Sequence, residues 1–184
     1  MLTALLLHIT LALPPTPAVP PATLRAAAAE AAALWVRYGV AIDAAPCDSP
    51  ADAGIVLLVV PIATPRTGGT AAGWRGPLAA ISFDADGAPE PRIRLFLSDL
   101  LAFVASARLF GQPESQWPRS LREELVGRVL GRVLAHEIGH FVLRMPRHTA
   151  AGLMRSLQFA DELVAPSRRA FALTGVDMSR LATR

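Results

Sequence analysis

Apolar residues alternate with polar or small ones along residues 7–13 (LHITLAL), which is the two-residue period of a half-buried β-strand. Residues 1–13 also have the length and apolarity of a signal-peptide core. However, no Lys or Arg precedes the apolar run, and prolines blur the expected cleavage pattern. The alternation therefore favours a strand over a signal at this position.

Further along the chain, the spacing of apolar residues changes between helical and extended periods. An Ala-rich stretch with helical spacing ends at Gly39, and the unbroken run IVLLVV at 55–60 is typical of a central strand covered on both faces. In chain order we expect a helix over 23–38, strands over 40–44, 55–60, 78–83 and 92–97, a helix over 98–109 with Ser98 as N-cap, and a long helix over 120–143. Loops are expected over 45–54, over the Gly-rich 64–77 and over 111–118. This order predicts an α/β or α+β layer built on one sheet.

Composition limits the classes of function. The chain has 184 residues, the size of one domain, and 52% of them are hydrophobic, enough to form a core. No apolar run reaches the 18 or so residues of a membrane span. All 18 basic residues are Arg, the net charge is only +3, and Arg168 and Arg169 form the only adjacent pair, so we expect no nucleic-acid surface. The single cysteine, Cys47, excludes an internal disulfide and is interpreted as a half-buried loop thiol.

The predicted helix over 120–143 contains the residues with the clearest chemistry. Ser120 and Glu123 have the spacing of a capping box at its start. His136 and His140 lie four residues apart, so on a helix both imidazoles project from one face and can reach one zinc ion at about 2.0–2.1 Å. Glu137 would lie beside the metal and is placed to take a proton from a metal-activated water.

A catalytic zinc site usually has three protein ligands and one open position. Pro146 prevents the helix from continuing past Met145, and the chain then presents His148, our first choice for the third ligand. Glu162 is the rival, with its neighbour Asp161 as a variant of the same choice, because some zinc sites use a carboxylate from a second helix.

Small residues recur every four positions on the same helix, at Gly127, Gly131, Ala135 and Gly139. Gly in a helix interior costs about 0.5–1 kcal/mol relative to Ala, so this repetition indicates a packing requirement. We expect the strip to let the helix approach a sheet or another backbone closely.

Residues 136–154, HEIGHFVLRMPRHTAAGLM, resemble the zincin metallopeptidases, and most closely the metzincin clan with its matrixin-like bacterial proteins. The resemblance implies a Zn²⁺ ion held by His136, His140 and His148, Glu137 as general base, and Met154 as the methionine of a turn beneath the metal. Two features depart from the pattern. Leu143 stands where metzincins have a helix-ending Gly, and the third His follows the second by eight residues instead of six.

The same resemblance implies a zincin-like α+β fold: a mixed, mostly parallel twisted sheet with an antiparallel edge strand, packed by two or three helices that include the zinc helix. It implies a single metallopeptidase-like domain over 1–184, with an upper subdomain over 1–144 and a small C-terminal subdomain over 145–184. Residues 78–83 are the candidate edge strand, which in this fold holds an extended peptide by main-chain pairing. After Met154 we expect one helix and irregular chain. The resemblance favours an extracytoplasmic location, and we expect a monomer that acts on peptide or protein substrates.

Three functions are compared, in order of preference. The first is a zinc-dependent metalloendopeptidase that hydrolyses peptide bonds through a zinc-activated water, with Glu137 as general base. The second is a non-catalytic zinc-binding module on a zincin scaffold. It is kept because no Tyr follows Met154 as an additional transition-state donor, which leaves Arg144, Arg147 or Arg155 for that role. The third is a metal-free binding domain in which the motif is fortuitous.

Overall fold

The computed structural model describes residues 7–45, 54–62, 76–156 and 159–183. Cys47, residues 1–6 and most of the Gly-rich segment 64–77 lie outside these ranges. A five-stranded sheet has the strand order β2-β1-β3-β5-β4, and all neighbours are parallel except β4 and β5. The strands are β1 (Leu7–Ala12), β2 (Val40–Ala45), β3 (Ile55–Ile62), β4 (Ala79–Phe83) and β5 (Pro89–Phe96).

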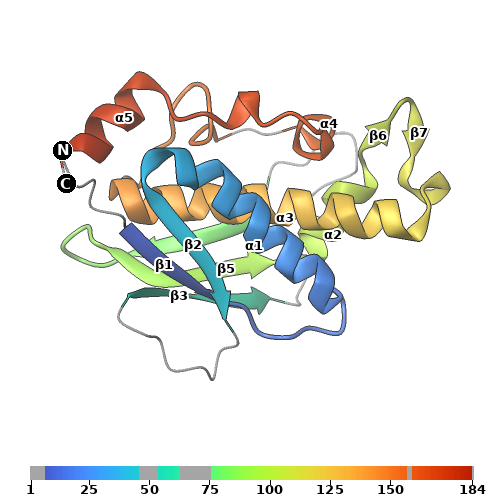
Figure 1. Ribbon diagram of the computed structural model, residues 1–184, viewed down its shortest axis with the longest axis horizontal. Coiled ribbons are helices and arrows are strands. Elements are labelled where there is room, and N and C mark those ends of the chain that lie inside the picture. The colour runs from blue at the N-terminus through green and yellow to red at the C-terminus, as the bar shows by residue number, and fades with distance from the viewer. Residues whose placement is uncertain (1–6, 46–53, 63–75, 157–158, 184) are drawn as a thin grey trace.

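Helices pack on one side of this sheet. They are α1 (Pro21–Trp35), α2 (Leu97–Ala105), α3 (Arg119–Leu143), α4 (Ala160–Val164) and α5 (Gly175–Ala182), with short 3₁₀ turns at Val36–Tyr38, Glu114–Gln116 and Arg169–Phe171. A small hairpin is formed by β6 (Arg108–Leu109) and β7 (Gln112–Pro113). Helix α3 runs between the sheet and the C-terminal segment, which is coloured orange to red in Figure 1. The predicted α+β class, with a mostly parallel sheet and one antiparallel edge, is confirmed.

The N-terminal alternation does form a strand. β1 pairs in parallel with both β2 and β3, so it is an inner strand of the sheet. Ile9 and Leu11 are fully buried on the helix-covered face, while Thr10 between them is only half-buried. The strand interpretation is therefore confirmed for residues 7–12.

The prediction that the central strand is covered on both faces is wrong. In β3, Leu57 and Val59 are buried, but Val56, Leu58 and Val60 are only half-buried. The described helices cover one face of the sheet, so burial alternates along a strand whose sequence is apolar at every position. The strand also continues through Pro61 to Ile62.

All three predicted helices start earlier than expected, and α1 begins at Pro21, two residues before the predicted start. α3 begins at Arg119 with Pro118 as N-cap and no side-chain cap, so the Ser120–Glu123 capping box is not formed. Glu123 instead accepts a hydrogen bond from Arg119 one turn away, at 2.8 Å. α2 begins at Leu97, directly after the last residue of β5, which leaves Ser98 inside its first turn. In α2 and α3 the N-cap therefore lies two residues before the predicted one.

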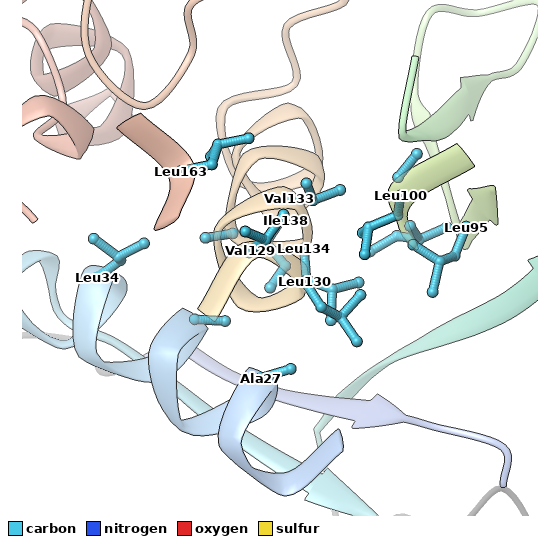
Figure 2. Close-up of a cluster of buried hydrophobic side chains, with 14 of the residues drawn as sticks. Ala27, Leu34, Leu95, Leu100, Val129, Leu130, Val133, Leu134, Ile138 and Leu163 are labelled. Atoms are coloured by element: carbon cyan, nitrogen blue, oxygen red, sulfur yellow. The ribbon is translucent and has the colours of Figure 1, made fainter. Parts of the chain in front are cut away.

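The strip of small residues on α3 faces α1. A Cβ atom added at Gly131 would lie 2.5 Å from the Ala27 carbonyl oxygen, and one at Gly127 would lie 3.1 Å from the Thr23 carbonyl oxygen. At Ala135, the backbone oxygen accepts a hydrogen bond from Trp35 Nε1 at 2.9 Å. The expected close approach is therefore confirmed, with another helix as the partner. Figure 2 shows the apolar side chains of α3 lying between α1 and the side chains of β5 and α2.

A buried ionic cluster joins α1, α3 and the C-terminal segment. Glu30 accepts hydrogen bonds from Arg132 Nε at 3.0 Å and from Arg168 Nη2 at 2.6 Å. The Arg132 side chain has no exposed surface, and its guanidinium carbon lies 4.5 Å from the centre of the Phe171 ring. Burial alone would raise the pKa of the Glu30 carboxyl, but the two arginines outweigh it and hold the pKa below its ordinary value. The cluster therefore stabilises the fold while Glu30 is ionised.

Glu30→Gln is expected to lower the free energy of unfolding by about 3 kcal/mol at neutral pH, because it leaves the buried Arg132 charge uncompensated. A carboxyl whose folded pKa is depressed contributes stability above its unfolded pKa and loses that contribution as the pH falls through the folded value. The difference between parent and variant should therefore shrink as the pH is lowered below 4.5, the ordinary carboxyl value. Urea unfolding from pH 7 to pH 3 measures this. Glu123→Gln, at a surface ion pair, is the control and should cost less than about 1 kcal/mol at every pH; an equal loss in both variants would contradict the expectation.

The segment after Met154 contains more helix than predicted. It forms α4, a 3₁₀ turn and α5, where one helix was expected. The terminal polar stretch is helical because Thr174 and Asp177 form a capping box at the start of α5. Within the described ranges, no helix combines the length and apolarity needed to cross a membrane.

Candidate metal centre

Three histidines meet at the C-terminal half of α3. His136 and His140 project from neighbouring turns of this helix, and His148 comes from the chain that follows it. The Nε2 atoms of His136 and His140 are 3.1 Å apart. The potential ligand atoms of all three side chains lie within 4.8 Å of one another. The cluster could therefore hold a metal ion.

Backbone carbonyls orient two of these rings. His136 Nδ1 lies 2.7 Å from the Leu153 oxygen, and His140 Nδ1 lies 2.5 Å from the Met145 oxygen. A carbonyl oxygen only accepts, so each Nδ1 must carry the proton and donate it. In a neutral imidazole this leaves each Nε2 with a lone pair, which is the atom and the state that a metal binds.

The two Nε2 atoms are close enough to share one cation. A proton is disfavoured in this role. Burial lowers the pKa of His136 to about 3, helped by the neighbouring His140 and opposed by the bond to the Leu153 oxygen. Burial likewise lowers the pKa of His140 and of His148. Neutral, pre-oriented imidazoles are the donor set expected of a metal centre.

The end of α3 explains the long spacing to the third histidine. The helix ends at Leu143, as predicted, and Arg144 takes the left-handed conformation with φ 46°. Glycine usually occupies such a position, because a Cβ atom is disfavoured there. The turn therefore comes one residue after the position where metzincins have Gly, and Pro146 follows it. His148 then reaches the other two rings despite the two additional residues.

After His148 the chain turns at Gly152, and Met154 packs against α3. Gly152 has φ 76°, and a Cβ atom there would lie 2.3 Å from the Ala172 backbone oxygen, so the turn requires glycine. Met154 is fully buried, and a Cβ atom at Gly139 would lie 2.2 Å from its sulfur. The methionine therefore packs against α3 at the turn between His136 and His140.

Glu137 lies beside the cluster and is held by the edge strand. It is 6% exposed, and its Oε2 accepts a hydrogen bond from the Ile81 backbone N–H at 2.9 Å. Burial raises the pKa of this carboxyl to about 7, although the Ile81 bond opposes the shift. A carboxyl with a raised pKa in a cavity is suited to exchanging protons near neutral pH.

A cavity of about 210 Å³ opens next to the histidines. Its walls are largely apolar, and its charged or titratable lining consists of Arg132, His136, Glu137, His148 and Arg155. An apolar pocket with a few convergent polar groups is the usual form of a small binding site.

The carboxylates that rivalled His148 lie elsewhere. Glu162 forms an ion pair with Arg155, and Asp161 accepts a hydrogen bond from the Arg108 backbone N–H at 2.8 Å. Among the described residues, neither joins the cluster of potential metal ligands. The structure therefore brings His148, and not Glu162 or Asp161, to His136 and His140.

Several contributors to the site were not identified from the sequence. The carbonyls of Met145 and Leu153 and the amide of Ile81 orient the three functional side chains on α3. No residue type marks a backbone group, so the sequence contains no local signal for these roles. Arg132 and Glu30 are 102 residues apart in the chain and were likewise missed.

Comparison with protein-family models, curated proteins and solved structures finds no match to this chain. The function therefore has to be argued from the geometry and chemistry of the site.

Proposed function

We propose that the protein is a zinc-dependent metalloendopeptidase of metzincin-like design. The observation that carries this is the pair of Nε2 atoms 3.1 Å apart on histidines whose Nδ1 atoms contact backbone carbonyls, with the Glu137 carboxyl in the same cavity. Tetrahedral zinc with bonds of 2.0–2.1 Å places two ligand nitrogens about 3.3 Å apart, close to this separation. His136, His140 and His148 would hold the ion, and the ligand set leaves one coordination position for chemistry.

Zinc, when bound, lowers the pKa of water and polarises a carbonyl group. Glu137 then supplies the proton transfers. Its carboxylate accepts the proton that water releases as the new C–O bond forms on the peptide carbonyl carbon. It then donates this proton to the amide nitrogen as the C–N bond breaks. The Ile81 N–H holds Oε2 throughout, which leaves Oε1 to exchange the proton.

Among the described strands β4 is the last on its side of the sheet, and this position supports a peptide as the substrate. Leu78 accepts a hydrogen bond from Phe96, which belongs to the neighbouring strand. In an antiparallel pair the bonded residues alternate, so the main-chain groups of Ala79 and Ile81 point away from β5. Ile81 donates to Glu137 in this direction. An extended peptide paired to this edge would therefore pass directly beside the general base.

The cavity supports recognition of an apolar side chain next to the cleaved bond. Its wall includes Phe103, Val133, Leu163 and Phe171. Arg132 and Arg155 also border it, but Arg132 is already paired with Glu30 and with backbone oxygens, and Arg155 is paired with Glu162. An acidic substrate side chain would have to compete with those partners, so apolar residues are expected to be preferred.

A peptide-library digest tests the proposed function. Protein loaded with one equivalent of zinc should cleave internal peptide bonds, and removal of the metal with a chelator should stop cleavage until zinc is restored. Bound zinc without cleavage of any peptide would support the non-catalytic module instead. A folded protein that binds no zinc would contradict both and leave a metal-free domain.

A further inference from the structure

Two arginines border the cavity, and the structure uses them differently. Arg132 is 1% exposed, and its donors are directed to the Glu30 carboxylate and to the backbone oxygens of Glu162, Leu163 and Ser167. Arg132 therefore binds the C-terminal segment through these hydrogen bonds. The Arg155 side chain is 27% exposed and lies on the cavity wall. Arg155 is therefore the arginine that a molecule in the cavity can reach.

The backbone places Arg155 beside Thr149, the residue that follows the third histidine. Thr149, the residue after His148, forms a parallel β-bridge with Arg155. The Thr149 N–H donates to the Met154 oxygen at 2.9 Å, which closes this bridge. The Arg155 side chain thus lines the same cavity as His136, Glu137 and His148.

Glu162 holds the guanidinium. Its carboxylate pairs with Arg155 Nη2, and both side chains are about one-quarter exposed, at 27% and 26%. Glu162, the alternative to His148 as a metal ligand in the sequence analysis, thus binds Arg155 at the cavity wall. The other two candidate arginines lie elsewhere. Arg144 lines a separate hollow with Arg180, and Arg147 is exposed.

We propose that Arg155 is a catalytic residue that donates a hydrogen bond to the carbonyl oxygen of the scissile peptide, and that Glu162 is its positioning residue. This rests on the proposed peptidase function. When water adds to the carbonyl carbon, the C=O π pair moves onto oxygen, and the negative charge grows there. The guanidinium stabilises that charge. As the C–N bond breaks, the pair returns to the carbonyl and the proton on Glu137 goes to the leaving nitrogen.

The test compares Arg155→Ala with the parent on the best-cleaved library peptide. Loss of one oxyanion donor typically costs about a hundredfold or more in kcat, so kcat should fall by that factor with KM within about twofold. A phosphinic peptide of the same sequence, whose tetrahedral phosphinate replaces the scissile amide, should lose a similar factor in affinity by calorimetry. Zinc per chain should not change. Arg147→Ala is the control and should leave kcat within about twofold.

Two further variants separate catalysis from folding. Glu162→Gln should lower kcat less than Arg155→Ala does, and Arg155→Lys should restore part of the rate. If Arg155→Ala fails to fold, Arg155→Met combined with Glu162→Leu removes both charges together and should fold, bind zinc and turn over slowly. Parental kcat in that double variant, or a change in KM alone, overturns the role of Arg155. A zinc-loaded parent that cleaves nothing overturns the peptidase function itself.

Discussion

Replacing Glu137 with Gln is expected to lower kcat by about 10²–10⁴-fold and to leave zinc binding unchanged. Gln keeps the shape of the side chain and can still accept the Ile81 hydrogen bond through its amide oxygen. It cannot take up the proton that water releases. The histidine rings are oriented by the carbonyls of Met145 and Leu153, not by Glu137, so the ligand set should stay intact. Steady-state cleavage of a library peptide and zinc per chain by mass spectrometry measure both quantities.

Glu124→Gln is the matched control. Glu124 lies on the same helix, is 60% exposed and pairs with Arg128 one turn away. Its replacement should change neither kcat nor zinc content. Parental activity in Glu137→Gln would remove Glu137 from the proton transfer. Loss of zinc in this variant would mean that the carboxylate binds the metal directly, contrary to the assignment of Glu137 as the base.

His148→Ala is expected to weaken zinc binding by more than about a hundredfold. Loss of a residue that merely orients a ligand already costs 10–100-fold in affinity, and His148 is assigned as a ligand itself. His148 is exposed to solvent, so the fold should tolerate alanine at this position. Competition with a fluorescent zinc chelator gives the affinity, and the melting temperature without metal gives the stability. The variant should melt close to the parent under metal-free conditions.

Glu162→Ala is the companion variant, because it removes the rival carboxylate. Glu162 pairs with Arg155 and lies outside the histidine cluster, so zinc affinity should stay within about threefold of the parent. Zinc lost with Glu162→Ala but kept with His148→Ala would reverse the assignment of the third ligand. Equal retention in both variants would indicate that two histidines and solvent hold the ion.

Local patterns predicted much of the scaffold. The two-residue period along 7–13 identified β1, Gly39 ended the first helical region with φ 76°, and the long helix ended at Leu143, before the limit that Pro146 sets. The repeated small residues on α3 indicated a close contact, which α1 makes. These features depend on each residue's own conformational preference and on its near neighbours, so they can be detected in a single sequence.

The sequence patterns gave wrong predictions where the local structure depends on a neighbouring or distant segment. The apolar run in β3 suggested cover on both faces, but cover depends on where the helices pack. The spacing of Ser120 and Glu123 suggested a capping box, but Pro118 and Arg119 had already started the helix. Both errors arose because a local pattern is compatible with several surroundings.

The candidate metal site also combines features that follow from local spacing with features that depend on distant segments. The amino-acid sequence is sufficient to predict that His136 and His140 share one helix face with Glu137 beside them, because the helical period sets that relation whatever surrounds the helix. The choice between His148 and Glu162 required the folded chain, since it depends on how the chain turns after Leu143 and on which partner Arg155 takes. The tertiary structure also chose the ring tautomers, through the Leu153 and Met145 carbonyls. Such contacts join segments whose separation in space is set by packing of the whole chain, and no local spacing encodes it.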